Sequence, residues 1–238
     1  MEEKELKTSL KQRIFISIIA IVMLGSMIAS YAAIVISGSS NSNSTSKIDE
    51  VKVAEYEALY KEKKEKLTEL SKDNFNKFIQ FKAEIAAFNE TSANESGLKI
   101  QDLLEGDGKV ITSEDTDYLA YYVGFCADES VFDSSFDDPK NPTAFETALA
   151  GSLNMIEGWK QGINGMKLGG IRKITIPGEL AYGETSEICG GFNKPLKFIV
   201  MLVANDGELG TVAAETQETY MRLQYANYGL DYDEVMGN

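Results

Sequence analysis

Few residue types in this chain could carry chemistry, and the missing ones exclude several kinds of active site. The 238 residues include no histidine and only two cysteines. Without histidine there can be no Ser-His-Asp or Cys-His nucleophile pair and no imidazole proton shuttle near neutral pH. Two cysteines cannot hold a four-thiolate zinc or iron–sulfur centre. We therefore expect neither a metal nor a cofactor, and any reaction must depend on other groups.

The most distinctive remaining group is the only tryptophan, Trp159. Within residues 152–162, Met155, Ile156 and Trp159 share one face of a predicted short helix. Tyr122 and Phe198 fall on predicted strands. Taken singly, each of these aromatic residues is most simply explained as a core residue. A functional interpretation needs several of them to converge on one place.

The elements that must position these side chains are four predicted strands and one helix. Short alternating runs predict strands over residues 98–100, 118–125, 171–176 and 196–203, and the helix lies between the second and the third. This order predicts an α+β domain over residues 97–205, in which an antiparallel sheet is crossed by one helix.

Six sequence runs follow one another across this domain. They are GLKIQDLLEGDGKV at 97–110, YYVGF at 121–125, VFDSS at 131–135, NMIEGWKQGINGMKLGG at 154–170, IRKITIPGELAYG at 171–183 and PLKFIVML at 195–202. In this order they resemble the FKBP-type peptidyl-prolyl cis-trans isomerases, and nothing outside residues 97–204 takes part. The resemblance implies a half-wrapped antiparallel sheet around a short helix.

The resemblance also implies an apolar pocket for a proline ring, with Trp159 as its floor. The backbone N–H of Ile156 would bind the substrate carbonyl, the Tyr182 hydroxyl would be a second polar anchor, and Asp133 would sit at the edge. The implied wall residues are Tyr122, Phe132, Ile156, Tyr182 and Phe198, with Met155 and Phe145 as further substrate contacts. The expected partners are proline-containing polypeptides. Rotation about an Xaa-Pro bond faces a barrier of about 18–20 kcal/mol, which an apolar pocket can lower without proton transfer.

Two departures from the family pattern leave a second function open. Residues 184–194 read ETSEICGGFNK, one residue shorter than usual, without proline and with a single isoleucine, Ile188. The run FDD at 136–138 replaces a basic residue that commonly pairs with the aspartate corresponding to Asp133. The alternative function is a non-catalytic, proline-recognising chaperone or interaction module.

The N-terminal part predicts a membrane anchor. Residues 14–36 contain no charged side chain, and a helix of this length spans the hydrocarbon core of about 30 Å. Basic residues cluster within 1–13, so the positive-inside rule keeps that end cytoplasmic and exports the remainder. The small-x-small run at 30–32 leaves a cleaved secretory signal as the alternative. A Ser/Asn-rich flexible linker at 37–47 would follow.

Residues 48–90 predict a helical stalk with an interrupted apolar seam and a four-residue slip at Asn74. One interpretation is a coiled coil that joins two copies of the chain. The other is an amphipathic helix that folds back on its own domain, and the phenylalanine-rich seam fits both.

Charge and cysteine content complete the expectations. The net charge of −14 disfavours nucleic-acid binding, and the tail at 206–238 is acidic and rich in tyrosine, with a predicted helix over about 211–227. In an exported chain, Cys126 and Cys189 could form a disulfide, but two unbridged thiols are equally compatible with the sequence.

Overall fold

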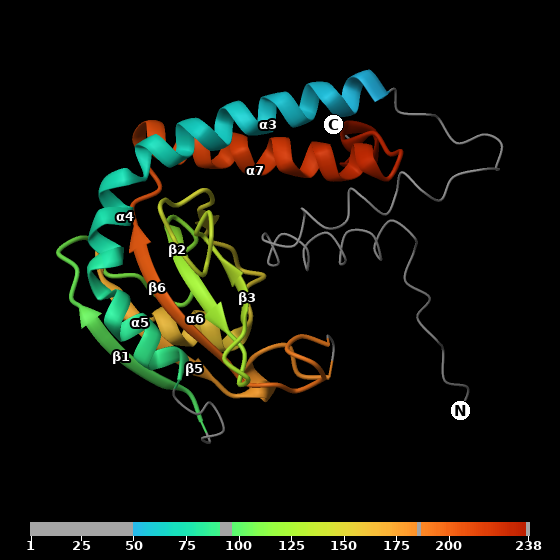
Figure 1. Ribbon diagram of the computed structural model, residues 1–238. Coiled ribbons are helices and arrows are strands. Elements are labelled where there is room, and N and C mark those ends of the chain that lie inside the picture. Colours follow the sequence, from blue (N-terminus) through green and yellow to red (C-terminus); the bar gives the residue numbers. More distant parts are fainter. Residues whose placement is uncertain (1–49, 91–96, 185–186, 237–238) are drawn as a thin grey trace, which may run out of the picture. The chain divides into compact units, whose positions relative to one another are not determined.

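The computed structural model describes residues 50–90, 97–184 and 187–236 (Figure 1). The predicted cytoplasmic end 1–13, anchor 14–36 and linker 37–47 lie outside these residues. Within the described part, no helix is both long enough and apolar enough to cross a membrane. The chain divides into two compact units, a larger one over 62–216 and a smaller one that contains 50–61 and the residues from 217 onward.

The larger unit is built on an antiparallel sheet. Its strands are β1 (Lys99–Leu104), β2 (Leu119–Phe125), β3 (Val131–Ser134), β4 (Leu149–Ala150), β5 (Ile171–Ile176) and β6 (Leu196–Val203). They are ordered β1-β5-β6-β2-β3, and β4 pairs with β2. Strands β2, β5 and β6 match the predicted strands to within one residue, whereas the prediction over 98–100 overlaps only the start of β1. Strands β3 and β4 were not predicted because they are short.

The two faces of the sheet have different coverings, since successive side chains of a strand point to opposite sides. Tyr121 of β2 belongs to a core beneath the helices α4 (Lys72–Phe78) and α5 (Lys82–Asn89), which a 3₁₀ turn, η1 (Ile79–Phe81), connects. The next residue, Tyr122, contacts the tryptophan of α6 (Glu157–Ile163) on the other side. Figure 1 shows α4 and α5 along one face and α6 behind the sheet.

Phe145 belongs to the core on the α4–α5 side, which corrects the expectation that it contacts substrate. It is fully buried, and its ring stacks on Tyr121 at 4.3 Å and on Phe136 at 5.3 Å between centroids. Phe75 and Phe78 of α4 meet it edge-on at 5.5 and 5.4 Å. The side chain therefore packs on the face opposite Tyr122 and Trp159.

The predicted stalk is not one helix. Helix α3 (Glu50–Leu70) ends at a break at Ser71, and α4 begins after it. The Ser71 hydroxyl forms a hydrogen bond of 2.6 Å with the Tyr121 hydroxyl. Leu67, Phe78 and Phe88 join the core of the domain. In the larger unit the stalk thus packs on its own domain, as the second interpretation predicts.

A buried lysine attaches the end of α5 to the sheet. Lys197 of β6 is 0% exposed, and its Nζ donates to the backbone oxygens of Phe88 at 2.8 Å and Asn89 at 2.7 Å. These oxygens lie at the helix C-terminus, where carbonyls lack helical partners and favour a cation. The Lys197 side chain therefore caps the C-terminus of this helix.

The C-terminal residues form helices α7 (Gly207–Asn227) and α8 (Tyr232–Met236). In the larger unit, Val212 and Ala213 join the core and Lys66 pairs with Glu208 at 2.6 Å. In the smaller unit, Lys52 pairs with Asp231 at 2.7 Å, and the rings of Tyr60 and Tyr220 lie 5.5 Å apart. The tail is thus packed within each unit.

Candidate active site

Helix α6 lies directly against β5 because two of its buried residues are glycines. A Cβ atom on Gly158 would stand 2.2 Å from Cγ2 of Ile176, and one on Gly162 would stand 2.7 Å from Cγ2 of Ile174. Neither distance is compatible with a side chain. The two glycines therefore bring Trp159, which lies between them, close to the sheet.

Arg172 of β5 fixes the other end of the helix. Its Nη1 donates to the backbone oxygens of Gly162 at 2.9 Å and Asn164 at 3.1 Å, and its Nε and Nη2 bind the carboxylate of Asp102 at 2.6 and 3.1 Å. The Arg172 side chain is almost completely buried. Because it satisfies carbonyls at the helix C-terminus, Arg172 holds the helix in one position.

The Trp159 side chain is the centre of an aromatic cluster. It is 3% exposed, and its Nε1 donates to the Tyr118 hydroxyl at 3.2 Å. The rings of Phe198 and Tyr122 stand nearly perpendicular to the indole, with centroids at 5.3 and 5.7 Å. Such edge-to-face contacts are favourable geometries for aromatic rings and define the orientation of the indole.

Phe132 extends this cluster toward the surface. Its ring meets Phe198 edge-on at 5.5 Å, and the residue is half-buried. Between the pairs Gly124↔Asp133 and Phe125↔Val131, strand β3 has one residue more than β2, and this residue is Phe132. Such an irregularity re-aims a side chain. Gly124 leaves the space for it, because a Cβ there would lie 2.8 Å from the Phe132 ring.

The polar edge of the cluster consists of Tyr122, Asp133 and Tyr182. The Tyr122 hydroxyl donates a short hydrogen bond to the Asp133 carboxylate. Burial, and then the negative charge of Asp133, raise the pKa of Tyr122 well above its usual value. The same two causes raise the pKa of Tyr182. Both phenols therefore stay protonated at neutral pH and can donate hydrogen bonds.

Ile156 stands at the start of α6. It is half-buried, has ψ 147°, and its carbonyl accepts from the Trp159 N–H at 3.0 Å. Within the described part of the chain its own N–H has no hydrogen-bond acceptor. The neighbouring Met155 is buried. Ile156 thus combines an apolar side chain with an available backbone donor.

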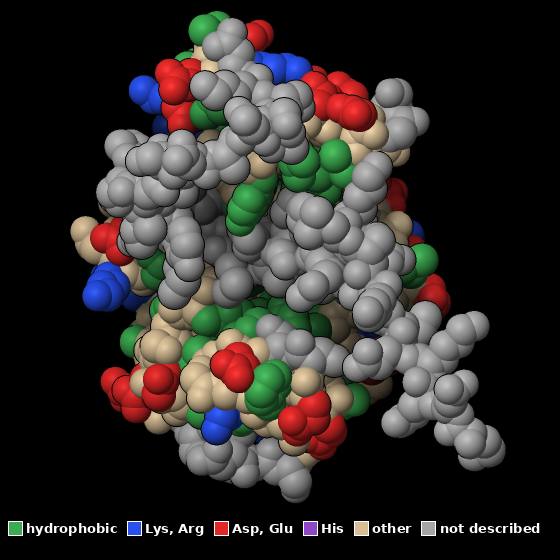
Figure 2. All heavy atoms as spheres, turned by 90° about the vertical axis from the view of Figure 1, so that its right-hand side faces the viewer, with side chains coloured by type: hydrophobic (Ala, Val, Ile, Leu, Met, Phe, Trp, Pro, Cys, Tyr) green, Lys and Arg blue, Asp and Glu red, His purple; other side chains and the backbone are tan. Residues whose placement is uncertain are grey.

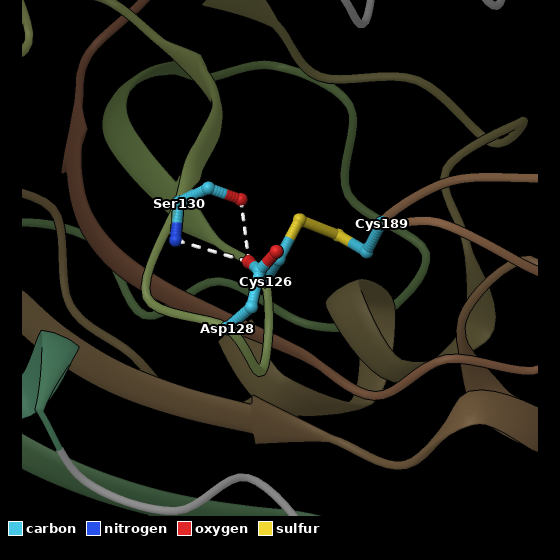
Figure 3. The surroundings of a disulfide bond; sticks show 4 residues. All are labelled: Cys126, Asp128, Ser130 and Cys189. Atoms are coloured by element: carbon cyan, nitrogen blue, oxygen red, sulfur yellow. Dashed lines mark hydrogen bonds between the residues drawn. A yellow bond between two sulfur atoms is a disulfide. The ribbon is translucent and has the colours of Figure 1, made fainter.

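The structure joins Cys126 and Cys189 by a disulfide, with 5.3 Å between the Cα atoms (Figure 3). Cys126 directly follows β2, and Cys189 lies in the loop between Tyr182 and β6. The bridge therefore ties together two segments that each carry candidate site residues.

Most of the expected site residues converge. Direct ring contacts and the hydroxyl–carboxylate bond connect Tyr122, Phe132, Asp133, Trp159 and Phe198, and Tyr182 is close enough to sense the Asp133 charge. Met155 and Ile156 immediately precede the helix of Trp159. Three supporting residues were not predicted: Tyr118, Gly124 and Arg172. Their roles depend on strand register, which no local sequence signal revealed.

Figure 2 shows several hydrophobic side chains on the face that it draws. Two exposed hydrophobic residues belong to loops next to the candidate site residues in the sequence. Leu153, 60% exposed, precedes Ile156, and Phe192, 46% exposed, follows Cys189. Both loops therefore present apolar side chains to solvent.

Comparison with known proteins identifies the family. Residues 108–203 match the family model of the FKBP-type peptidyl-prolyl cis-trans isomerases. An FK506-binding protein of Neisseria meningitidis serogroup B is 41% identical over 87 residues, which cover 37% of this chain and 75% of the relative. An FK506-binding protein of Streptomyces anulatus is 42% identical over 89 residues, which cover 37% of this chain and 67% of the relative. A macrophage infectivity potentiator of Trypanosoma cruzi is 35% identical over 127 residues, which cover 52% of this chain and 61% of the relative. With its antiparallel sheet and α6, the chain belongs to the FKBP-type peptidyl-prolyl cis-trans isomerases.

Proposed function

We propose that the protein isomerises Xaa-Pro bonds of polypeptides that fold outside the membrane, and that the aromatic cluster receives the proline ring. One observation carries this proposal: the ring of Phe198 stands nearly perpendicular to the rings of both Trp159 and Phe132. The indole of Trp159 is buried, and the phenyl group of Phe132 is half-buried, so the cluster extends toward the surface. Such a surface complements a flat apolar ring and excludes water from it.

The proposed mechanism needs no proton transfer. Amide resonance makes the planar Xaa-Pro bond polar, and water stabilises that polarity. Transfer of the bond to an apolar surface removes this stabilisation, so the less polar twisted amide becomes relatively more favourable. Trp159 and Phe198 would contact the ring, and the rigid cluster would favour the twisted shape.

Two donors would orient the substrate. The N–H of Ile156, which has no acceptor among the described residues, would bind the carbonyl next to proline. The Tyr182 hydroxyl, whose pKa is raised further above neutrality by burial, would donate to a second carbonyl. Asp133 would hold Tyr122 in position through the hydroxyl–carboxylate bond.

The test is the rate of cis–trans exchange in an Xaa-Pro peptide, measured by NMR exchange spectroscopy with the full chain in detergent. We expect Trp159→Ala to lower kcat/KM at least about 30-fold, since it removes the central anchor of the cluster. Tyr182→Phe should lower it about threefold to tenfold, the effect of one hydrogen bond. Tyr228→Phe is the control, because it removes a hydroxyl from an exposed tyrosine of the smaller unit. Equal activity in all variants would contradict the proposed pocket.

A second candidate function is proline recognition without useful turnover. The loop at 184–194 favours it, because this loop lacks the proline-rich sequence that family members normally place against the substrate. In that case the chain would bind proline peptides in a Trp159-dependent way but would not accelerate exchange. Binding and exchange measured on the same peptide separate the two functions.

We also propose that residues 14–36 anchor the protein and that the isomerase domain lies outside the membrane. The uncharged run supports the anchor, the basic residues before it support the orientation, and the disulfide is typical of an oxidising compartment. Protease added to intact cells should then digest the domain, and N-terminal sequencing should detect the intact N-terminus. A mature start near residue 33 would instead indicate a cleaved signal.

Dimerisation through the stalk stays a prediction. Several seam residues, including Phe78 and Phe88, are already buried in their own domain, so a dimer would have to use other positions on α3. Analytical ultracentrifugation of the full chain in detergent measures the mass directly, and a monomer would exclude the coiled-coil interpretation.

A further inference from the structure

We propose that the Cys126–Cys189 disulfide is a positioning element for substrate binding, which holds the loop at 187–194 in place beside the hairpin that carries Tyr122 and Phe132. This inference rests on the proposed isomerase function. It assigns a role in substrate affinity to a bond that lies outside the aromatic cluster itself.

On the hairpin side of the bond, hydrogen bonds within the turn also hold the backbone. The Cys126 N–H donates to the Ser130 carbonyl at 2.8 Å, and the Glu129 N–H donates to the Cys126 carbonyl at 3.2 Å. The Asp128 carboxylate accepts from the N–H and the hydroxyl of Ser130 at 3.1 and 2.6 Å (Figure 3). This turn leads directly into Phe132 and Asp133. Cys126 is therefore a fixed point close to the candidate site.

The loop side is fixed at its base by other contacts. The Asn193 N–H donates to the Gly183 carbonyl at 2.6 Å, next to Tyr182. The Asn193 carbonyl packs so closely on Gly178 that a Cβ there would lie 2.1 Å away. These contacts close the base of the loop, but the disulfide attaches its middle, at Cys189.

The backbone of the loop supports this assignment. Cys189 has φ +60°, a left-handed conformation that a residue with a side chain adopts only when its surroundings impose it. The next two residues, Gly190 and Gly191, add flexibility, and residues 184–194 contain no proline to restrict it. Without the bond, the segment that carries Ile188 and Phe192 would sample many conformations.

An ordered loop matters for binding more than for the chemical step. Ordering a flexible segment when the substrate arrives costs affinity, and a cross-link removes that cost beforehand. The rings around Trp159 lie on α6 and the sheet, which keep their positions when the loop moves. Breaking the bond should therefore raise KM and leave kcat nearly unchanged.

The experiment compares the oxidised full chain, the same chain reduced with TCEP, and the double variant Cys126→Ser/Cys189→Ser, all in detergent. The phosphine reduces the disulfide to two thiols and is itself oxidised to the phosphine oxide, and one water molecule supplies the oxide oxygen and the two thiol protons. We expect KM for an Xaa-Pro peptide to rise about threefold to tenfold in both bond-free forms, with kcat changed less than about twofold. TCEP should not affect the double variant, and reoxidation of the reduced chain should restore KM.

Hydrogen exchange supplies a second measurement. It can be made on the wild-type chain, which is reduced after it has folded, so the test does not depend on whether the double variant folds. Amides of 187–192 should exchange faster after reduction, whereas those of β6 should not. Unchanged KM or unchanged loop exchange in a folded, reduced protein would overturn the positioning role and leave the isomerase function intact. A loss of kcat alone would overturn it as well. No activity in the oxidised chain would instead overturn the proposed function.

Discussion

Tyr122 connects the apolar and polar parts of the candidate site. Its ring contacts Trp159 and Phe198, and its hydroxyl donates to Asp133. Tyr122→Phe keeps the ring but removes a hydrogen bond to a buried carboxylate. We expect the free energy of unfolding to fall by about 1.5–3 kcal/mol, the typical contribution of a hydrogen bond to a charged group. Urea denaturation measures this change, and an unchanged midpoint would show that the bond does not stabilise the fold.

The two site tyrosines also predict the pH dependence. Burial and the charge of Asp133 raise the pKa of both Tyr122 and Tyr182, so their phenols stay protonated as the pH rises. The chain has no histidine to titrate near neutrality. We therefore expect kcat/KM to be constant from about pH 6 to 9. A bell-shaped profile in this range would indicate an acid or base that the proposed mechanism lacks.

The same shifts give a stability prediction in alkali. A folded-state pKa above that of the unfolded chain means that the unfolded tyrosines lose their protons first. Stability should therefore fall as the pH rises above about 10. Urea midpoints measured across this range should decrease in the wild type, and a midpoint independent of pH would contradict the burial of these hydroxyls.

At the level of single residues, the sequence predicted the groups with distinctive identity and missed those with a purely geometric role. The spacing predicted that Ile156 and Trp159 lie on one face of a short helix, but their roles in the site, like those of the other candidates, followed from the family resemblance. Phe145 was misplaced because an aromatic residue in an irregular segment can turn to either face of a sheet. Gly124 and Arg172 were missed because their importance depends on which residue lies opposite.

Among the elements, α6 owes its position to its glycines. Gly158→Ala would place a methyl group 2.2 Å from Ile176, so the helix must shift away from β5 and move Trp159 with it. We expect kcat/KM to fall, although alanine is the better helix former by about 1 kcal/mol. Gln161→Ala, on the exposed side of the same helix, is the control and should retain activity. A fully active Gly158→Ala enzyme would show that α6 can move freely.

Lys197 stabilises a different element, because its side chain binds the C-terminal end of helix α5. Lys197→Met keeps the apolar stem but leaves the carbonyls of Phe88 and Asn89 without their donor. We expect a loss of about 1–3 kcal/mol in the free energy of unfolding, with faster hydrogen exchange at the end of α5. Isomerase activity should persist, because this contact lies on the face opposite Trp159. Slow exchange in the variant would argue against the role as a helix cap.

Among the elements, the longer strands were easier to predict from the sequence than the shorter ones. The long strands β2, β5 and β6 each span six or more residues rich in apolar and β-branched side chains, whereas β3 and β4 are too short for a periodic signal. The stalk was recognised as helical, but its break at Ser71 was not. At this break the Ser71 hydroxyl bonds to the hydroxyl of Tyr121, a residue that is distant in the sequence.

For the whole molecule, the disulfide should also contribute to stability. It joins residues separated by 63 positions, and closure of a loop of this length lowers the entropy of the unfolded chain. Reduction should lower the free energy of unfolding by about 2–4 kcal/mol. Urea curves with and without TCEP measure this, with the double variant Cys126→Ser/Cys189→Ser as the control that TCEP should not affect. Coincident curves for the wild type would contradict the prediction.

The composition of the whole chain excluded several classes of active site, whereas the isomerase function followed from the family resemblance, and neither predicted the arrangement of the helices. The lack of histidine is compatible with an isomerase that needs no proton transfer. An apolar seam, by contrast, indicates only that a helix must be covered. Whether a second copy or the same chain covers it depends on the tertiary structure, and here Phe78 and Phe88 pack on their own sheet.

The only tryptophan of the chain lies at the centre of the candidate site, with its indole N–H bonded to Tyr118. Its emission spectrum is therefore an intrinsic optical probe of that one location. A ligand that enters the aromatic cluster should change the intensity or wavelength of this emission without any attached dye. Proline peptides can then be screened by fluorescence titration of the unlabelled wild-type protein.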